Sequence, residues 1–166
     1  LSLAKSIEGF IRDGYYGGRT EVFRSYIGDG KGYYYDVRGM YAQAMKSDLP
    51  YGKPSWKTHF DSNWLRDDMQ KGFYKVSVEA PLMDIPVLPY RTSSGKLIFP
   101  VGKWEGTYYS DELLLAKDHG YILTPIEAVV FSSSRHFLRQ YVDDFTKIKN
   151  MGGAYKIGRA SCRERV

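Results

Sequence analysis

The spacing of apolar residues changes several times along this chain, and these changes limit the folds that it can adopt. Residues 3–12 and 135–150 repeat their apolar side chains at the interval of one helical face. Residues 75–80 alternate between apolar and polar side chains, as a half-exposed strand does. Strand-like and helix-like segments follow one another without a regular strand-helix-strand rhythm. The sequence therefore predicts an α+β fold with an antiparallel sheet.

Turn-forming residues delimit the shorter elements. A glycine-rich turn at residues 28–32 separates the strand-like segments 20–23 and 33–37, which predicts a hairpin. A helix is expected over residues 39–46, because Pro50 prevents its continuation. The other expected elements are a loop at 52–54, strands at 97–99 and 121–131, and a helix from the N-cap Ser110 to His119.

The two ends of the chain affect how its charge is interpreted. The 166 residues carry a net charge of +5, which permits nucleic acid binding. Residues 156–166 have no apolar periodicity and resemble a translated sequencing adapter; a natural basic tail that binds nucleic acid is the alternative. Without them the net charge falls to +2 and the single cysteine, Cys162, is lost. The start at Leu1, without an initiator Met, leads us to expect a segment of a longer protein.

Asp36 is the clearest candidate for chemistry, because it ends an expected strand directly before an expected helix. A carboxylate in this position can bind Mg²⁺ beside backbone carbonyls and near helix amides that can hold phosphate. The same position also suits a simple helix cap, which is the more common arrangement. Spacing alone leaves both interpretations open.

Several motifs in order favour the metal interpretation. The segment Asp36-Val37-Arg38-Gly39-Met40-Tyr41 resembles motif A of family B DNA polymerases, whose usual form is Asp-Val-Asn-Ser-Leu-Tyr-Pro. Upstream, Tyr15-Tyr16-Gly17-Gly18 is similar to the Tyr-x-Gly-Gly motif of the protein-primed branch of that family. Residues 49–54 and 85–104 resemble the organellar and linear-plasmid members. The resemblance extends over residues 3–150, and an ordered set of motifs is more specific than any single one.

The resemblance implies roles for the residues of motif A. Asp36 would be the catalytic ligand of both Mg²⁺ ions of a two-metal mechanism, and the carbonyl of Val37 would complete the coordination. Tyr41 would lie under the sugar of the incoming nucleotide and exclude a ribose 2′-hydroxyl. Arg38 replaces the usual Asn, where it would either repel Mg²⁺ or reach the triphosphate. Gly39 replaces the usual Ser and lacks its hydroxyl.

The resemblance also assigns the rest of the chain. Tyr15, Gly17 and Gly18 would contact the template, since an aromatic ring and bare backbone suit single-stranded DNA. The implied fold is a partial polymerase palm plus a protein-priming insertion. The implied regions are the end of the exonuclease region with the Tyr-x-Gly-Gly linker at 1–32, the palm segment at 33–54, the priming insertion with a palm-flanking helix at 55–155, and the adapter-derived tail at 156–166.

A rival motif occurs near the end of the chain. Tyr141-Val142-Asp143-Asp144-Phe145 has the letters of a polymerase catalytic turn, as in reverse transcriptases. Such a turn needs a β-hairpin with both carboxylates at its tip. The surrounding apolar residues follow the helical period instead, which predicts a helix that exposes Asp143 and Asp144.

Two functions from different classes follow from the sequence. The first is a segment of a DNA-directed DNA polymerase that replicates linear DNA by protein priming, with template and primer DNA, deoxynucleoside triphosphates and a terminal protein as partners. Such a segment is expected to be mitochondrial, and to be inactive alone because motifs B and C are not found in it. The second is a non-catalytic module that binds single-stranded DNA or a terminal protein. No run of about 18 apolar residues occurs, so no membrane-spanning helix is expected.

Overall fold

The computed structural model describes residues 5–26 and 28–151, and these divide into two compact units. One unit contains the described residues up to Gly30 together with Pro50–Ser134. The other contains Lys31–Leu49 and the residues from Arg135 onward. Each unit is described by itself below. The 156–166 tail, with its adapter interpretation, lies outside the described residues.

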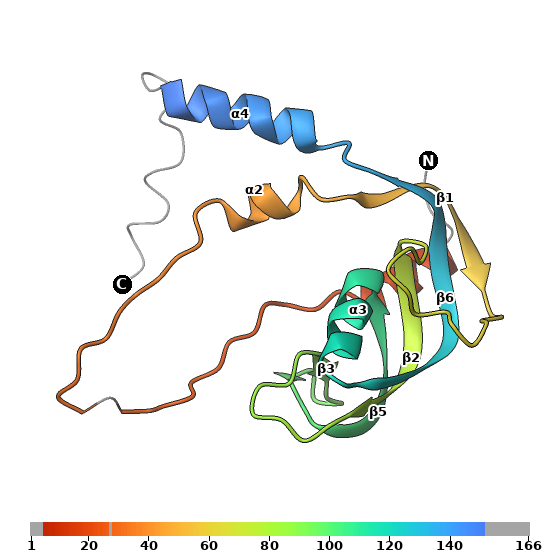
Figure 1. Ribbon diagram of the computed structural model, residues 1–166, viewed down its shortest axis with the longest axis horizontal. Helices are drawn as coiled ribbons and strands as arrows, with labels where there is room; N and C mark the ends of the chain where they lie inside the picture. The colour runs from red at the N-terminus through yellow and green to blue at the C-terminus, as the bar shows by residue number, and fades with distance from the viewer. Residues whose placement is uncertain (1–4, 27, 152–166) are drawn as a thin grey trace. The chain divides into compact units, whose positions relative to one another are not determined.

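A four-stranded sheet forms the centre of the first unit (Figure 1). Its strand order is β1 (Leu49–Lys57), β6 (Ile122–Arg135), β2 (Gly72–Ala80) and β5 (Gly102–Tyr109). Strand β2 pairs antiparallel with both β5 and β6. A separate antiparallel pair is formed by β3 (Tyr90–Arg91) and β4 (Leu97–Ile98). Together with its helices, this sheet confirms the predicted α+β class.

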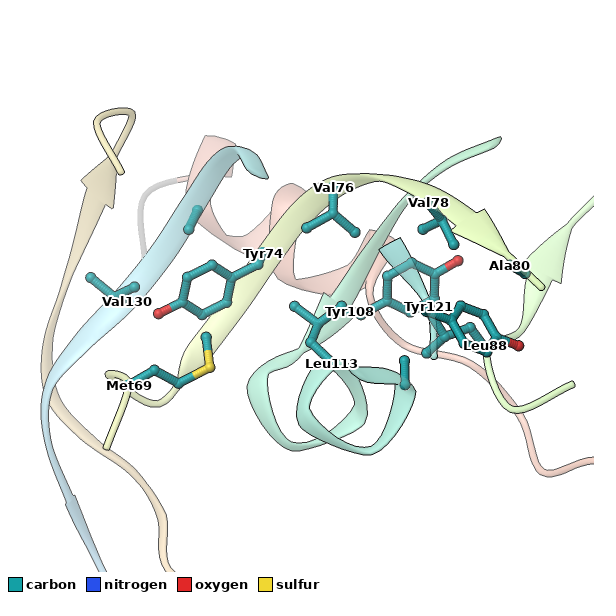
Figure 2. Close-up of a cluster of buried hydrophobic side chains, with 12 residues drawn as sticks. Met69, Tyr74, Val76, Val78, Ala80, Leu88, Tyr108, Leu113, Tyr121 and Val130 are labelled. Carbon is teal, nitrogen blue, oxygen red and sulfur yellow. The ribbon is translucent and has the colours of Figure 1, made fainter. Parts of the chain in front are cut away.

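One face of the sheet packs against helix α3 (Ser110–Asp118). Alternate residues of β2 are buried because successive side chains of a strand point to opposite faces. They meet Tyr108 of β5 and Leu113 of α3, and both of these side chains are fully buried. Figure 2 shows these side chains gathered between the sheet and the helix. The cluster comprises Met69, Tyr74, Val76, Val78, Ala80, Leu88, Tyr108, Leu113, Ala116, Tyr121, Ala128 and Val130.

The side chains of β2 and β5 that alternate with this cluster meet the end of helix α1 (Lys5–Asp13). A Cβ atom on Gly14 would lie 2.7 Å from the Phe73 ring and 3.3 Å from the Thr107 methyl group. Within α1 itself, Phe10 is buried and its ring meets Trp56 edge-on at 4.9 Å. Glycine at position 14 therefore lets the chain leave α1 in close contact with the sheet.

Pro125 interrupts the pairing of β6 with β2. The register shifts between Lys75, which faces Glu127, and Val76, which faces Pro125. Proline has no backbone N–H for the ladder, so a bulge at this point accommodates it inside a long strand. On β2, buried side chains lie on both sides of this shift, at Tyr74 and Val76.

A half-buried carboxylate caps α3. Glu112 Oε2 accepts the backbone N–H of Tyr109 at 2.9 Å, which satisfies one of the free donors at the start of the helix. Tyr109 is thus the N-cap, one residue before the Ser110 predicted from sequence. Burial raises the pKa of the Glu112 carboxyl, although the bond from Tyr109 opposes this effect.

The second unit contains two helices, α2 (Met40–Ala44) and α4 (Arg139–Met151). The Lys46 ammonium group, just after α2, forms an ion pair with Asp143 of α4. The Lys46 carbonyl oxygen lies 2.9 Å from Nδ1 of His136, which precedes α4. These two contacts hold the short helix against the longer one.

Three local predictions were wrong. Segments 20–23 and 33–37 form no strand, because their apolar side chains are exposed and no described segment pairs with them. Residues 52–54 belong to β1, whose position at the sheet edge tolerates Pro50 and Pro54. Strand β5 was not predicted, because Gly102 and Gly106 obscure its alternation.

The pKa shift of Glu112 predicts how stability depends on pH. The folded-state pKa is raised, so the contribution of Glu112 is most favourable below the ordinary glutamate pKa of about 4.3 and is lost as the pH rises through the folded pKa. Glu112→Gln keeps an acceptor for Tyr109 and should remove this loss. Glu112→Ala loses the acceptor for Tyr109 and should be less stable than Glu112→Gln by about 1 kcal/mol at every pH. Urea unfolding from pH 3.5 to 7.5 measures both effects, and parallel profiles for wild type and Glu112→Gln would contradict the first.

Tyr108 provides a second test of the core. Its hydroxyl accepts the Trp104 Nε1–H and donates to the Pro89 carbonyl, each at 2.7 Å. Tyr108→Phe should cost about 1–3 kcal/mol, since both partners would lose a hydrogen bond inside the protein. Tyr26→Phe, at an exposed position, should cost less than about 0.5 kcal/mol. Denaturant unfolding of both variants makes the comparison, and equal stabilities would refute the assignment.

Candidate functional site

The segment around Asp36 is exposed and extended. Residues 31–37 have no regular secondary structure, and each of their side chains is exposed. Tyr34 has 96% of its surface accessible, and the rings of Tyr33 and Tyr35 stack on each other at 6.5 Å. The Asp36 carboxylate is therefore presented to solvent at the end of an apolar run, directly before a turn and helix α2.

Gly39 sets the geometry between Asp36 and Tyr41. It adopts a left-handed conformation with φ of 64°, and its carbonyl accepts the N–H of Gln43 at 2.9 Å. A side chain is disfavoured at this φ, so glycine suits the position better than the serine usual in motif A. Helix α2 begins at the next residue and carries Tyr41, which is 80% exposed. Asp36 and Tyr41 thus lie on either side of one tight turn, both open to solvent.

The rival motif is helical, as predicted. Asp143 and Asp144 both lie within α4 and form no hairpin. Asp143 pairs with Lys46, and this hydrogen bond lowers the pKa of the exposed Asp143 carboxyl. Asp144 accepts both hydrogen bonds of the Gln140 amide, at 2.9 and 3.0 Å. Each carboxylate has a structural partner, so the catalytic-turn interpretation is wrong in this structure.

The described residues contain no group of three or more histidine, cysteine, aspartate or glutamate side chains placed to hold a metal ion. Asp36 offers one carboxylate, and the Val37 carbonyl offers a second oxygen of the kind that Mg²⁺ prefers. The chemistry of these two oxygens fits part of a magnesium site. Among the described helices, none is both long and apolar enough to cross a membrane.

The Tyr-x-Gly-Gly segment lies in the first unit and forms an irregular strap, defined here as Tyr15–Arg19. Tyr15 is 77% exposed, and both glycines are exposed. Neither Gly17 nor Gly18 has a positive φ, so the conformational freedom expected for them is not used here. A Cβ atom on either one would meet no described atom within 4 Å. The strap therefore presents open backbone beside an exposed aromatic ring.

The residues that hold this strap were not predicted from the sequence. Arg91 donates to the Tyr15 carbonyl at 2.7 Å, and Arg19 donates to the Pro86 carbonyl at 2.7 Å. Tyr16, between the named motif residues, stacks on Tyr108 at 5.5 Å. No local pattern could have revealed these contacts, because the partners are far apart in the sequence.

This chain is similar to known proteins in both sequence and fold. Residues 1–153 match the family described as DNA polymerase type B, organellar and viral. The chain belongs to this family. It is similar to a probable DNA polymerase of Neurospora intermedia, at 35% identity over 89% of this chain and 16% of that protein. A probable DNA polymerase of Podospora anserina is 32% identical over 93% of this chain and 12% of that protein. The chain thus spans less than a fifth of the length of these two relatives.

Solved structures agree with the fold. Phi29 DNA polymerase in an orthorhombic crystal form matches 90% of this chain and 28% of its own, with a TM-score of 0.64 and 22% identity. Phi29 DNA polymerase complexed with primer-template DNA and incoming nucleotide substrates matches 91% of this chain and 28% of its own, with a TM-score of 0.63. At this identity the likeness shows a shared fold, and it agrees with the α+β class of this chain.

Proposed function

We propose that this chain is a segment of a DNA-directed DNA polymerase that replicates linear DNA by protein priming. The observation that carries the proposal is the exposed Asp36 carboxylate, placed one tight turn before Tyr41 in a chain of the type B family. A nucleotidyl transfer site needs a carboxylate open to metal and triphosphate, with a side chain nearby that can sense the sugar. Asp36, just before the second unit's short helix, and Tyr41, within that helix, supply these two groups.

Two oxygen ligands for magnesium are part of this proposal. Asp36 and the carbonyl of Val37 would hold it, and it would supply charge stabilisation for phosphoryl transfer when bound. Among the described residues the exposed Asp36 carboxylate has no ion-pair partner, so it is open to a cation. Arg38, two residues further on and exposed, has the charge to attract a triphosphate.

The protein-priming role, the partners and the location belong to the same proposal. Template and primer DNA, deoxynucleoside triphosphates and a terminal protein are the partners expected of the longer protein, and a mitochondrial location is expected with them. Residues 1–32, 33–54 and 55–155 are proposed as the linker, palm and priming regions. The exposed strap supports template contact, because bare backbone and an aromatic ring suit single-stranded DNA.

The alternative is a non-catalytic module that binds single-stranded DNA or a terminal protein. It is favoured by the compact sheet unit, which has its own core and carries the strap without needing the residues around Asp36. The two functions differ in what they require of Asp36. A binding module does not depend on that carboxylate, whereas a polymerase does.

Asp36→Asn in the full-length protein tests the catalytic role. The amide keeps the size of the side chain but removes the negative charge that a metal ion requires, so primer extension with Mg²⁺ should fall by at least about three orders of magnitude. Affinity for primer-template DNA should stay within about threefold of wild type. Asp29→Asn, which also changes an exposed aspartate, should leave both unchanged. Normal synthesis by Asp36→Asn would favour the binding module.

Tyr41 tests the nucleotide assignment separately. Tyr41→Val should relax discrimination against ribonucleotides by about tenfold or more, since the ring that would block the 2′-hydroxyl is removed. Tyr41→Phe keeps the ring and should keep the discrimination. Single-nucleotide incorporation with matched deoxy and ribo substrates provides kcat/KM for each. Unchanged selectivity in Tyr41→Val would remove the steric role.

A further inference from the structure

Arg91 of β3 is the side chain that holds the start of the strap. Its guanidinium group donates to the Tyr15 carbonyl at 2.7 Å and lies over the Tyr16 ring, 5.3 Å from the centroid. One planar group thus fixes two consecutive residues of the strap. Tyr15 lies 76 positions before Arg91 in the sequence.

The Tyr16 ring is itself well anchored. It stacks on Tyr108 with an interplanar angle of 21°, and burial is the main cause of its raised pKa. Tyr108 is fully buried and is bonded to Trp104 and to the carbonyl of Pro89. Because Pro89 lies two residues before Arg91, the same short segment contacts both Tyr108 and the strap.

The other end of the strap is held by its own arginine. Arg19 donates to the Pro86 carbonyl at 2.7 Å and lies 4.6 Å from the centroid of the Phe99 ring. Its guanidinium also pairs with Glu21. Both ends of the strap are therefore bound to segment 86–99, which contains β3 and β4.

Gly17 and Gly18 span the interval between the two anchors. Both are exposed, and among the described residues no atom lies within 4 Å of a Cβ built on either one. Their backbone is open to a ligand, and neither glycine has a backbone–backbone hydrogen bond to another described residue. The direction in which this backbone faces is consequently set by the anchors.

We propose that Arg91 is a positioning residue, which fixes the strap so that the open backbone of Gly17 and Gly18 faces single-stranded DNA. This inference rests on the proposed template contact of the strap. Lysine cannot replace arginine in such a role, because a point charge cannot both donate to the Tyr15 carbonyl and lie flat on the Tyr16 ring. Arg91→Lys keeps the positive charge but loses the planar group, so it distinguishes a positioning role from a direct phosphate contact.

The test uses the full-length protein and a fluorescein-labelled oligothymidylate. Arg91→Lys and Arg91→Gln should each weaken binding by about tenfold, since both lose the planar contact. The slope of log K against log salt concentration, measured from 50 to 200 mM NaCl, should equal that of wild type, because no phosphate contact is lost. Arg24→Lys, at an exposed arginine in the same unit, should bind like wild type.

Two further readouts distinguish positioning from general destabilisation. Hydrogen exchange at Tyr15, whose N–H donates to the Arg12 carbonyl at 3.0 Å, should accelerate by about tenfold in Arg91→Lys, while exchange in β2 stays unchanged. Nucleotide incorporation at saturating template should remain within about twofold of wild type, so that the defect lies in DNA affinity alone. Accelerated exchange in β2 would overturn the inference.

Two other outcomes would contradict the positioning role of Arg91. Wild-type affinity in Arg91→Lys, combined with a salt slope reduced by about one in Arg91→Gln, would make Arg91 a phosphate contact and overturn the positioning role. A wild-type protein that does not bind the oligonucleotide would contradict the proposed template contact of the strap, and the inference would fall with it. Failure of the proposed function is thus seen in the wild type, and failure of the positioning role is seen in Arg91→Lys.

Discussion

The buried hydroxyl of Tyr108 joins the core of the first unit to the segment that holds the strap. The hydroxyl donates to the Pro89 carbonyl, which connects β5 to the segment leading into β3. It also accepts the indole N–H of Trp104, a residue of the same strand. The ring of the same residue supports Tyr16 and hence the strap. A Cβ atom on Gly106 would lie 2.5 Å from this hydroxyl, so the absence of a side chain two residues earlier gives the ring its place. The position of the Tyr108 side chain therefore affects both the packing of the core and the placement of the strap.

Much of this fold follows from the sequence, for reasons that particular elements make clear. Helices α1 and α4 were predicted because their apolar spacing is periodic over several turns, and β2 because its alternation produces one buried face. The hairpin at residues 20–37 was wrong because strand-like composition is insufficient without a partner strand. Apolar side chains at 33–35 have no described surface on which to pack, and that segment stays exposed.

The candidate site was only partly predictable. Asp36 and Tyr41 could be located because their motif is contiguous and the turn between them is local. Arg91 could not, since an arginine at a strand end gives no indication of which distant carbonyl it will bind. The glycines illustrate the same limit: Gly39 is needed for its left-handed conformation, whereas Gly17 and Gly18 are not. The sequence shows where glycine occurs, and only the structure shows which of these glycines has a left-handed backbone.

Helix α2 has five residues, which is too few for a helix to be stable in water by itself. Its support comes from Asp143 and from His136, which contacts a residue 90 positions earlier in the chain. During synthesis the residues around Tyr41 leave the ribosome long before these partners exist. The turn that joins Asp36 to Tyr41 therefore gains this support only after the strands of the sheet, which lie between α2 and α4 in the sequence, have been synthesised.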